Sequence, residues 1–336
     1  MRSAEVGELL GKRGLSQRVG RRMRWWRVTS LVFAAVVAGG CAAPTESSTP
    51  PPSKAVRVVS VDKVNDWTRD VVLDSPSVGE TRARLLLPVG FEAEPHRRWP
   101  VLYLLHGADD PDTYKCWTRS TDVAALTAGL PLLVVMPEGG TEGYYSNWFN
   151  EGRGGPPAWQ TFHLAELRQV LERDWRASDH RAVAGLSMGG LGAMLYAAHS
   201  PHLFRAAASF SGVLDTLGTS DWQFPPEVWG NRSQQARVWR QHNPTDRAAD
   251  LRGISLFVSY GNGDPGPLDV AGTSTSGVGG QIERRLEPGN AAFVRRLGEL
   301  GIPAEVDAYG PGIHDWPYWQ RELHRALPGI MRALQP

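Results

Sequence analysis

The sequence predicts an α/β fold: a mostly parallel central sheet covered by helices on both faces, in one body that spans residues 55–336. Two observations predict it. Short continuous apolar runs recur along this body, and such runs are typical of strands that are buried on both faces of a sheet. Between them lie stretches whose apolar residues recur every three or four positions, as they do in helices. Buried strands that alternate with helices form parallel sheets with helices packed on each face.

The amino terminus differs in character from the body. Residues 1–40 carry 8 of the 36 Lys and Arg residues, and an apolar run at 31–38 is followed by Gly39, Gly40 and Cys41. A basic segment, a short apolar run and small residues describe an export signal. The run is too short to cross a bilayer, which needs about 20 residues. Cys41 has the position of the lipidated cysteine in a bacterial lipoprotein. We therefore expect a domain anchored by lipid on the outer face of the cell membrane or, alternatively, secreted free.

Residues 41–54 are rich in Pro, Ser and Thr and predict a flexible tether, because such a composition cannot bury a core. Residues 41–336 hold 28 Lys and Arg against 33 Asp and Glu, a net charge of −5. An acidic body without a basic cluster argues against a nucleic-acid partner. Cys116 is the one cysteine left in the body, so neither an intrachain disulfide nor a Cys-x-x-Cys metal spacing is available.

The body begins with short β-rich segments and continues with buried runs. The segment at 81–88 alternates at first and ends at Pro88, which cannot continue a central ladder. The run at 100–105 and those after it lack polar alternation, as expected for strands in the middle of a sheet. The expected strands are 56–61, 70–74, 81–88, 100–105, 132–136, 181–184, 254–259 and 305–309.

Three helices are predicted from apolar residues at spacings of three and four. Asn290 is expected to cap the second helix, and Gly301 to end it. The third is expected to bend at Pro328, because proline lacks the N–H that a helix interior uses. The apolar positions of the first and third helices are Leu164, Leu167, Leu171 and Trp175, and Trp319, Leu323, Leu327 and Ile330.

Tryptophans gather in a segment without a clear period. Residues 215–250 contain Trp222, Trp229 and Trp239, which suggests an insertion over the carboxyl edge of the sheet. Together with Trp148 and Trp316, these side chains are predicted to line an acyl or aromatic cleft that binds substrate. Burial as ordinary core residues is the alternative reading.

The stretch from Arg181 to Gly190 predicts a nucleophilic serine. An apolar run ends in Gly185-Leu-Ser-Met-Gly189, and a segment of small residues follows directly. This is the strand, sharp turn and helix of the nucleophile elbow in α/β hydrolases, with Ser187 at its tip. Glycine is needed on both sides because the tight turn presses backbone against backbone. A glycine-rich turn with a surface serine is the alternative.

A serine hydroxyl needs a base, and histidine is suited to that role near neutral pH. In this fold the acid and then the histidine follow the serine along the chain. His314 lies in a Gly-rich loop between the last predicted strand and the last helix, where open α/β sheets place their sites. The other histidines after Ser187 are predicted to lie on the surface or away from the site: His199, His202, His242 and His324.

The acid and the oxyanion hole are predicted less directly. Asp264 follows the strand at 254–259, and Glu283 lies in a helical segment; spacing alone does not choose between these carboxylates. An oxyanion hole needs two backbone N–H groups. One is expected from Met188, after the serine, and the other from Ala108, in the loop after the strand at 100–105. His106 is expected to orient this loop at the substrate side of the site.

Five motifs support a wider resemblance. In chain order they are Leu104-Leu-His-Gly107, Pro137-Glu-Gly-Gly140 with Tyr144-Tyr-Ser-Asn-Trp148, Gly185-Leu-Ser-Met-Gly-Gly190, Gly261-Asn-Gly263 and His314-Asp-Trp-Pro-Tyr-Trp319. Together they resemble the esterase family that includes esterase D, feruloyl-type esterases and the antigen 85 mycolyltransferases. The resemblance covers nearly the whole body, from about Val56 to the carboxyl terminus.

The resemblance implies an α/β-hydrolase fold and favours Glu283 as the acid. In the antigen 85 branch the acid is a Glu about ten residues before a helical Phe and some thirty before the His, which Glu283 matches. The chain departs from that branch at His106, Asp109 and Asp315, where mycolyltransferases carry Asp, Arg and Ser. The first two changes touch the acceptor side of the pocket. An esterase, or a transferase with another acceptor, is therefore favoured over a trehalose mycolyltransferase.

The sequence thus predicts serine-dependent acyl transfer from carboxylic esters, with no metal or organic cofactor. Ser187 is the predicted nucleophile, His314 the base and Glu283 the acid. The expected substrate is a small ester or an envelope lipid or glycolipid, and the acyl acceptor is water, a sugar or a glycerol hydroxyl. The rival hypothesis is a non-catalytic lipoprotein that binds envelope components on a hydrolase scaffold.

Overall fold

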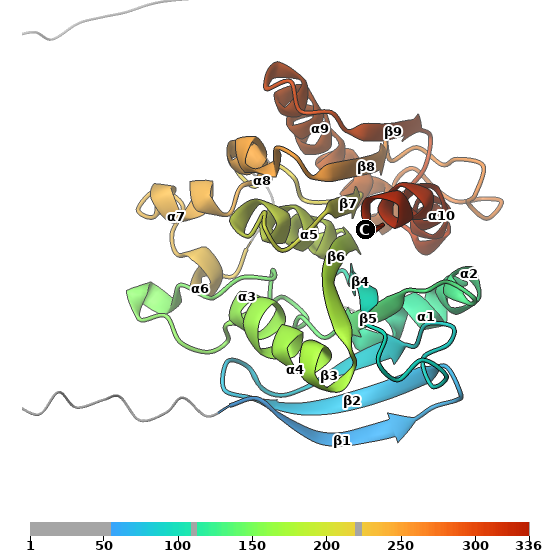
Figure 1. Ribbon diagram of the computed structural model, residues 1–336. Coiled ribbons are helices and arrows are strands. Elements are labelled where there is room, and N and C mark those ends of the chain that lie inside the picture. Colours follow the sequence, from blue (N-terminus) through green and yellow to red (C-terminus); the bar gives the residue numbers. More distant parts are fainter. Residues whose placement is uncertain (1–54, 109–112, 219–223, 336) are drawn as a thin grey trace, which may run out of the picture. The chain divides into compact units, whose positions relative to one another are not determined.

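The computed structural model describes residues 55–108, 113–218 and 224–335, so the predicted signal at 1–40 and tether at 41–54 lie outside the described part. The described residues form a nine-stranded sheet in the order β1-β2-β3-β5-β4-β6-β7-β8-β9, which runs from bottom to top in Figure 1. Neighbours from β5 to β9 in this order are parallel, and the first three strands are antiparallel. The strands are β1 (Arg57–Lys63), β2 (Thr68–Ser75), β3 (Gly79–Leu86), β4 (Trp99–Leu105), β5 (Leu133–Pro137), β6 (Ala177–Leu186), β7 (Ala206–Phe210), β8 (Ser255–Gly261) and β9 (Glu305–Gly310).

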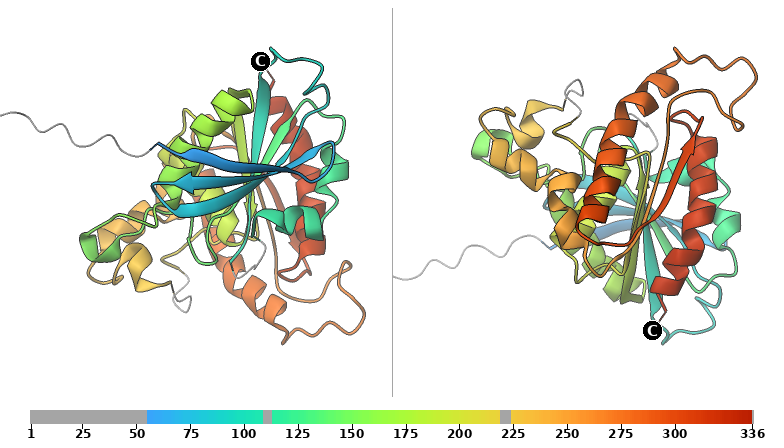
Figure 2. Two further views of the ribbon diagram at one scale, coloured as in Figure 1. Left: turned by 90° about the horizontal axis from the view of Figure 1, so that it is seen from below. Right: turned by 90° about the horizontal axis from the view of Figure 1, so that it is seen from above.

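Helices cover both faces of this sheet, as the sequence predicted. α4, α5 and α9 lie on one face, and α1, α2 and α10 on the other (Figures 1 and 2). The helices are α1 (Cys116–Ser120), α2 (Val123–Thr127), α3 (Trp159–Thr161), α4 (Arg168–Asp174), α5 (Met188–His199), α6 (Pro226–Trp229), α7 (Ala236–Gln241), α8 (Pro244–Arg247), α9 (Val278–Glu299) and α10 (Trp316–Ala333). Single turns are η1 (Thr113–Lys115), η2 (Asn150–Gly152), η4 (Ala248–Leu251) and the π-helical η3 (Phe162–Leu167), which joins α3 to α4.

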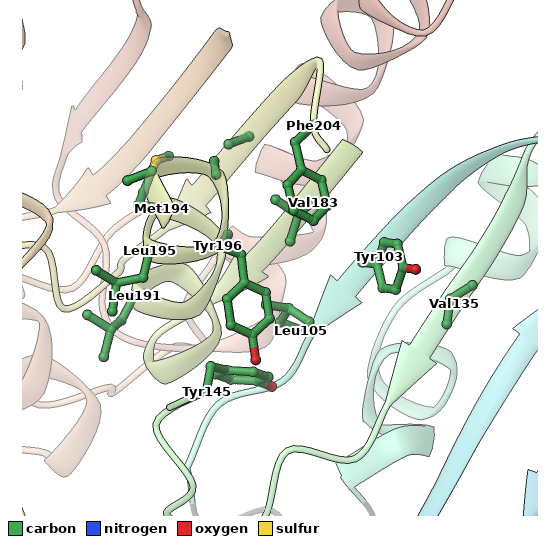
Figure 3. Close-up of a cluster of buried hydrophobic side chains, with 14 of the residues drawn as sticks. Tyr103, Leu105, Val135, Tyr145, Val183, Leu191, Met194, Leu195, Tyr196 and Phe204 are labelled. Atoms are coloured by element: carbon green, nitrogen blue, oxygen red, sulfur yellow. The ribbon is translucent and has the colours of Figure 1, made fainter. Parts of the chain in front are cut away.

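Strand β4 shows why the apolar runs are continuous. Tyr103 and Leu105 belong to the core beneath α5, whereas Leu102 and Leu104 belong to the core beneath α10. Successive side chains of a strand point to opposite faces, so a strand covered on both faces needs apolar residues throughout. On the α5 side, the ring of Tyr196 meets that of Tyr145 edge to face, with centroids 5.9 Å apart (Figure 3).

One central strand, β7, is not predicted by the sequence pattern. β7 reads Ala-Ala-Ala-Ser-Phe, and all five of its residues are buried. Alanine has low strand propensity, so this run predicts no strand by itself. The small side chains allow the strand to fit between β6 and β8 with helices close on both faces.

The second predicted helix begins earlier than expected. α9 starts at Val278, so Asn290 is an interior residue and the predicted cap at that position is wrong. The buried side chain of Asn290 donates hydrogen bonds to the carbonyl oxygens of Gly212 (2.8 Å) and Leu286 (2.9 Å). The helix continues through Pro288. It ends before Gly301, which has a φ of +63°.

The described residues of the Trp-rich insertion form the short helices α6, α7 and α8 between β7 and β8. Trp229 and Trp239 are buried, with ring centroids 5.2 Å apart, and the indole N–H of Trp229 donates to Ser146 Oγ at 3.1 Å. These two tryptophans therefore belong to the core on the α5 face of the sheet, and the helices of the insertion lie to the left of α5 in Figure 1. Trp222 lies outside the described residues.

Candidate active site

The predicted nucleophile stands at a strained turn. Ser187 joins β6 to α5 with a φ of 53° and a ψ of −120°, a conformation that non-glycine residues adopt only where their surroundings enforce it. A Cβ on Gly185 would lie 2.3 Å from the carbonyl oxygen of Gly189, and one on Gly189 would lie 2.5 Å from that of Leu105. The two glycines therefore permit the turn, which places Ser187 at the carboxyl end of β6.

The structure brings Glu283 to His314. The His314 Nδ1–H donates to Glu283 Oε2 at 2.7 Å. The other oxygen, Oε1, accepts hydrogen bonds from the Ser211 hydroxyl (2.8 Å) and from the backbone N–H of Gly261 (2.7 Å). Glu283 is fully buried, and a buried carboxylate needs such donors because it has lost its water.

Asp264, the other candidate acid, is placed differently. Its side chain is 55% exposed and forms an ion pair with Arg284 at 3.1 Å. Its backbone N–H is bound by the side chain of Asn262. Of the two carboxylates that spacing left open, Glu283 is therefore the one that contacts the histidine.

His314 is held on three sides. It lies between β9 and α10, and its backbone N–H donates to the carbonyl oxygen of Gly279 at 3.1 Å. The indole of Trp319 meets its ring edge to face at 4.9 Å. Because Nδ1 donates to the carboxylate, the neutral ring presents Nε2 as its proton-accepting nitrogen.

Four neighbouring parallel strands supply these groups. Ser187 follows β6, Ser211 follows β7, Gly261 ends β8 and His314 follows β9. The backbone N–H of Ser187 donates to the carbonyl oxygen of Phe210, the last residue of β7, at 2.9 Å. The carboxyl ends of parallel strands meet at one edge of a sheet, which is where open α/β folds place their ligands. The sheet itself therefore assembles this site.

The predicted oxyanion loop runs against the elbow. A Cβ on Gly107 would lie 2.8 Å from the Leu186 side chain and 3.5 Å from Ser187 Cβ. Ala108 follows this glycine. Met188 begins α5, where backbone N–H groups have no partner within the helix. Stabilisation of an oxyanion by Ala108 and Met188 remains a prediction.

His106 fixes this loop through backbone contacts. Its Nδ1–H donates to the carbonyl oxygen of Gly107 at 2.6 Å, and its Nε2 accepts from the backbone N–H of Gly139 at 2.8 Å. The residue is almost completely buried. This geometry supports the predicted orienting role, whereas contact between His106 and a substrate remains a prediction.

Beneath the loop lies a buried polar network that the sequence does not reveal. The Tyr145 hydroxyl donates to the carbonyl oxygen of His106 at 3.0 Å, and its ring lies beside that of His163. His163 Nε2–H donates to the carbonyl oxygen of Glu138, while Nδ1 accepts from the Tyr196 hydroxyl, both at 2.7 Å. Burial lowers the pKa of His163 to about 3, so the ring is neutral. The network ties the loops after β4 and β5 to α5.

Trp148 and Trp316 are half-buried. The Trp148 indole donates to the carbonyl oxygen of Gly143 at 3.2 Å. Trp316 begins α10, two residues after His314, and packs edge to face on Trp117 and Trp319. Their role in lining a substrate cleft remains a prediction.

Among residues 55–108, 113–218 and 224–335, no group of three or more His, Cys, Asp or Glu side chains is arranged to hold a metal ion. No helix within those ranges is both long and apolar enough to cross a membrane.

The sequence is similar to those of known esterases and acyltransferases. The sequence pattern of a family described as "Putative esterase" matches residues 77–330. Esterase Rv1288 of Mycobacterium tuberculosis is 34% identical over 277 residues, which cover 75% of this chain but 56% of that protein. The chain thus spans about half the length of this relative. The diacylglycerol acyltransferase/mycolyltransferase Ag85B of Mycolicibacterium smegmatis is 28% identical over 254 residues, 70% of this chain and 77% of the relative.

Solved structures show the same fold. A ferulic acid esterase superposes with a TM-score of 0.59 at 25% identity, covering 81% of this chain and all of the other. MPT51 of Mycobacterium tuberculosis superposes with a TM-score of 0.63 at 24% identity, covering 78% and 96%. The fold is therefore that of the α/β-hydrolase esterases, as predicted.

Proposed function

Because the chain belongs to the family described as "Putative esterase", we propose that it transfers acyl groups from carboxylic esters through an acyl-serine intermediate. The observation that carries this proposal is the 2.7 Å hydrogen bond between Glu283 and His314, at the edge of the sheet where Ser187 occupies the nucleophile elbow. Ser187, His314 and Glu283 follow one another in the chain order of α/β hydrolases.

The proposed reaction has two halves. Ser187 Oγ attacks the ester carbonyl while His314 Nε2 takes its proton, and Glu283 stabilises the imidazolium that forms. The N–H groups of Ala108 and Met188 bind the tetrahedral oxyanion. When the intermediate collapses, the alcohol leaves with the proton from His314, and the acyl group remains on Ser187. An incoming hydroxyl, deprotonated by His314, then releases the acyl group and restores the serine.

Water is the acceptor that we favour. The chain carries His106 and Asp315 where the resembled mycolyltransferases have Asp and Ser. His106 is engaged by backbone groups on both nitrogens, and the Asp315 carboxylate caps α10 by accepting from the Trp316 N–H at 2.7 Å. Because both ring nitrogens of His106 are engaged within the protein, this side chain favours water over a sugar as the acceptor. Transfer to a sugar or glycerol hydroxyl is the second candidate, supported by the similarity to Ag85B.

The place of action follows from the amino terminus. The signal-like residues 1–40 and Cys41 support a protein that is exported and anchored by lipid, or secreted, and that acts on envelope esters or on small esters outside the cytoplasm.

Partition of the acyl group tests the proposal. The protein is supplied with p-nitrophenyl esters of short and long acyl chains, with and without trehalose or diacylglycerol, and the acyl products are identified by mass spectrometry. We expect free acid equal in amount to the p-nitrophenol released, with either acceptor present. A new trehalose or glycerol ester as the main product would favour the transferase. No p-nitrophenol from any ester would favour the non-catalytic alternative.

A further inference from the structure

The Glu283 oxygen that faces away from His314 also has a side-chain partner. Glu283 Oε2 faces His314, and Oε1 accepts from the Gly261 N–H and from the hydroxyl of Ser211. Ser211 is thus the side chain that contacts the carboxylate on the side opposite the histidine. Ser211 itself is buried, so water does not compete for its hydroxyl.

The backbone around Ser211 is fixed. The residue follows β7 with a φ of 48°, in the left-handed region that non-glycine residues rarely adopt. Its N–H donates to the carbonyl oxygen of Ser259 in β8 at 2.7 Å. This contact holds the serine in its turn, from which the side chain reaches α9.

Trp319 determines the direction of the Ser211 hydroxyl. The indole Nε1–H of Trp319 lies 3.3 Å from Ser211 Oγ, and an indole N–H is a donor only. The serine oxygen accepts from Trp319, and the serine proton is donated to Glu283 Oε1 at 2.8 Å. A carboxylate is only an acceptor, so the hydrogen bonds of these three groups run from Trp319 through Ser211 to Glu283.

The same tryptophan contacts the base. Trp319 is buried on α10, and its ring meets that of His314 edge to face at 4.9 Å. Trp316 in turn packs edge to face on Trp319, with ring centroids 5.1 Å apart. One side chain thus restrains His314 directly and Glu283 through Ser211.

We propose that Ser211 and Trp319 are positioning residues: Trp319 orients the Ser211 hydroxyl, and that hydroxyl holds the Glu283 carboxylate with Oε2 toward His314. Both residues act on the reaction through Glu283 and His314. The inference rests on the proposed function, because positioning of the pair matters only if the pair serves Ser187.

The test compares Ser211→Ala, Trp319→Phe and the double variant. Ser211→Ala should lower kcat for a p-nitrophenyl ester about 10- to 100-fold with little change in KM, since one hydrogen bond to a charged group is lost. Trp319→Phe keeps a ring against His314 but loses the donor, and a decrease of about 3- to 10-fold is expected. If both act through one hydroxyl, the double variant is no slower than Ser211→Ala.

Ser209→Ala is the matched control. Ser209 is a fully buried serine two residues earlier, in β7, and its hydroxyl has no hydrogen-bond partner among the described residues. This variant should keep the full rate. Ser211→Gly serves as a second test, because glycine tolerates the positive φ and should show the same loss if the hydroxyl matters.

Labelling with a fluorophosphonate separates positioning from stability. In Ser211→Ala we expect slower labelling that still reaches one label per chain. Fewer labelled molecules at the wild-type labelling rate would mean a purely structural role and would overturn the inference. Equal rates for Ser211→Ala, Ser209→Ala and the wild type would also overturn it, while leaving the proposed function intact. A wild-type protein that neither labels nor turns over ester would instead remove the proposed function.

Discussion

At the scale of single residues, the choice of the acid in the candidate active site depends on one carboxylate being buried and another being exposed. Glu283 is fully buried, and it accepts from three donors: Ser211 after β7, Gly261 at the end of β8, and His314. Asp264, 19 positions earlier in the sequence, is half exposed and meets a surface arginine. A buried carboxylate can hold and stabilise an imidazolium, whereas water screens an exposed one.

Substitution of the two carboxylates distinguishes their roles. Glu283→Gln should lower kcat by about 10³- to 10⁴-fold, because a neutral amide neither fixes the histidine tautomer nor stabilises its charged form. Asp264→Asn should stay within about threefold of the wild type, since exposed ion pairs contribute little. Steady-state rates with one p-nitrophenyl ester decide the matter. The reverse order of effects would assign the acid role to Asp264.

Sequence reasoning reaches some of these residues and not others. Ser187 and His314 follow from local patterns: a glycine-flanked serine after an apolar run and a histidine in a glycine-rich loop after the last strand. Glu283 is favoured through resemblance alone. The contacts of Ser211 with Glu283 and Trp319 have no local signal, because these hydrogen bonds join residues 72 and 108 positions apart. Such contacts exist only once the sheet has brought the strand ends together.

At the scale of elements, the apolar pattern predicts a strand or helix correctly where close packing does not require other residue types. The runs at 100–105, 132–136 and 254–259 correspond to β4, β5 and β8, each shifted by one or two residues at an end. β7 is missed because alanine has low strand propensity, although its small side chain allows helices to pack close to the strand. The start of α9 at Val278 is missed because Asn290 has the residue type of a helix cap. The first turn contains Gly279, where a Cβ would lie 3.2 Å from the carbonyl oxygen of His314.

Helix α10 shows the converse case. Its predicted apolar stripe is confirmed, with Leu323, Leu327 and Ile330 buried beneath the sheet. The helix includes Pro328 and continues to Ala333. The amphipathic pattern therefore decides the extent of this helix, although proline disfavours a helix interior.

At the scale of the whole molecule, burial of neutral histidines makes stability depend on pH. Burial lowers the pKa of His163 to about 3 and that of His242 to about 4, and it also lowers the pKa of His199. In the unfolded chain these groups titrate near 6.5. Between those values the unfolded state binds protons that the folded state does not. The contribution of these neutral histidines to the free energy of unfolding is therefore fully present above about pH 6.5, and it decreases as the pH falls.

A histidine substitution measures this effect. For His163 alone, the free energy of unfolding should fall by about 2 kcal/mol between pH 7.5 and pH 5. In His163→Gln, which keeps a donor and an acceptor without a titrating ring, the decrease should be smaller by about that amount. Urea unfolding at the two pH values gives both numbers, and His96→Gln is the control because His96 is exposed. An equal decrease in wild type and His163→Gln would contradict the assignment.

The central claim is that Ser187 is the nucleophile that His314 and Glu283 activate. Mass spectrometry after treatment with a fluorophosphonate tests it most directly, because the reagent marks activated serines. We expect one adduct per chain, on the peptide that contains Ser187, and none in Ser187→Ala. Undiminished labelling of Ser187→Ala, or an adduct on another residue of the wild-type protein, would contradict it.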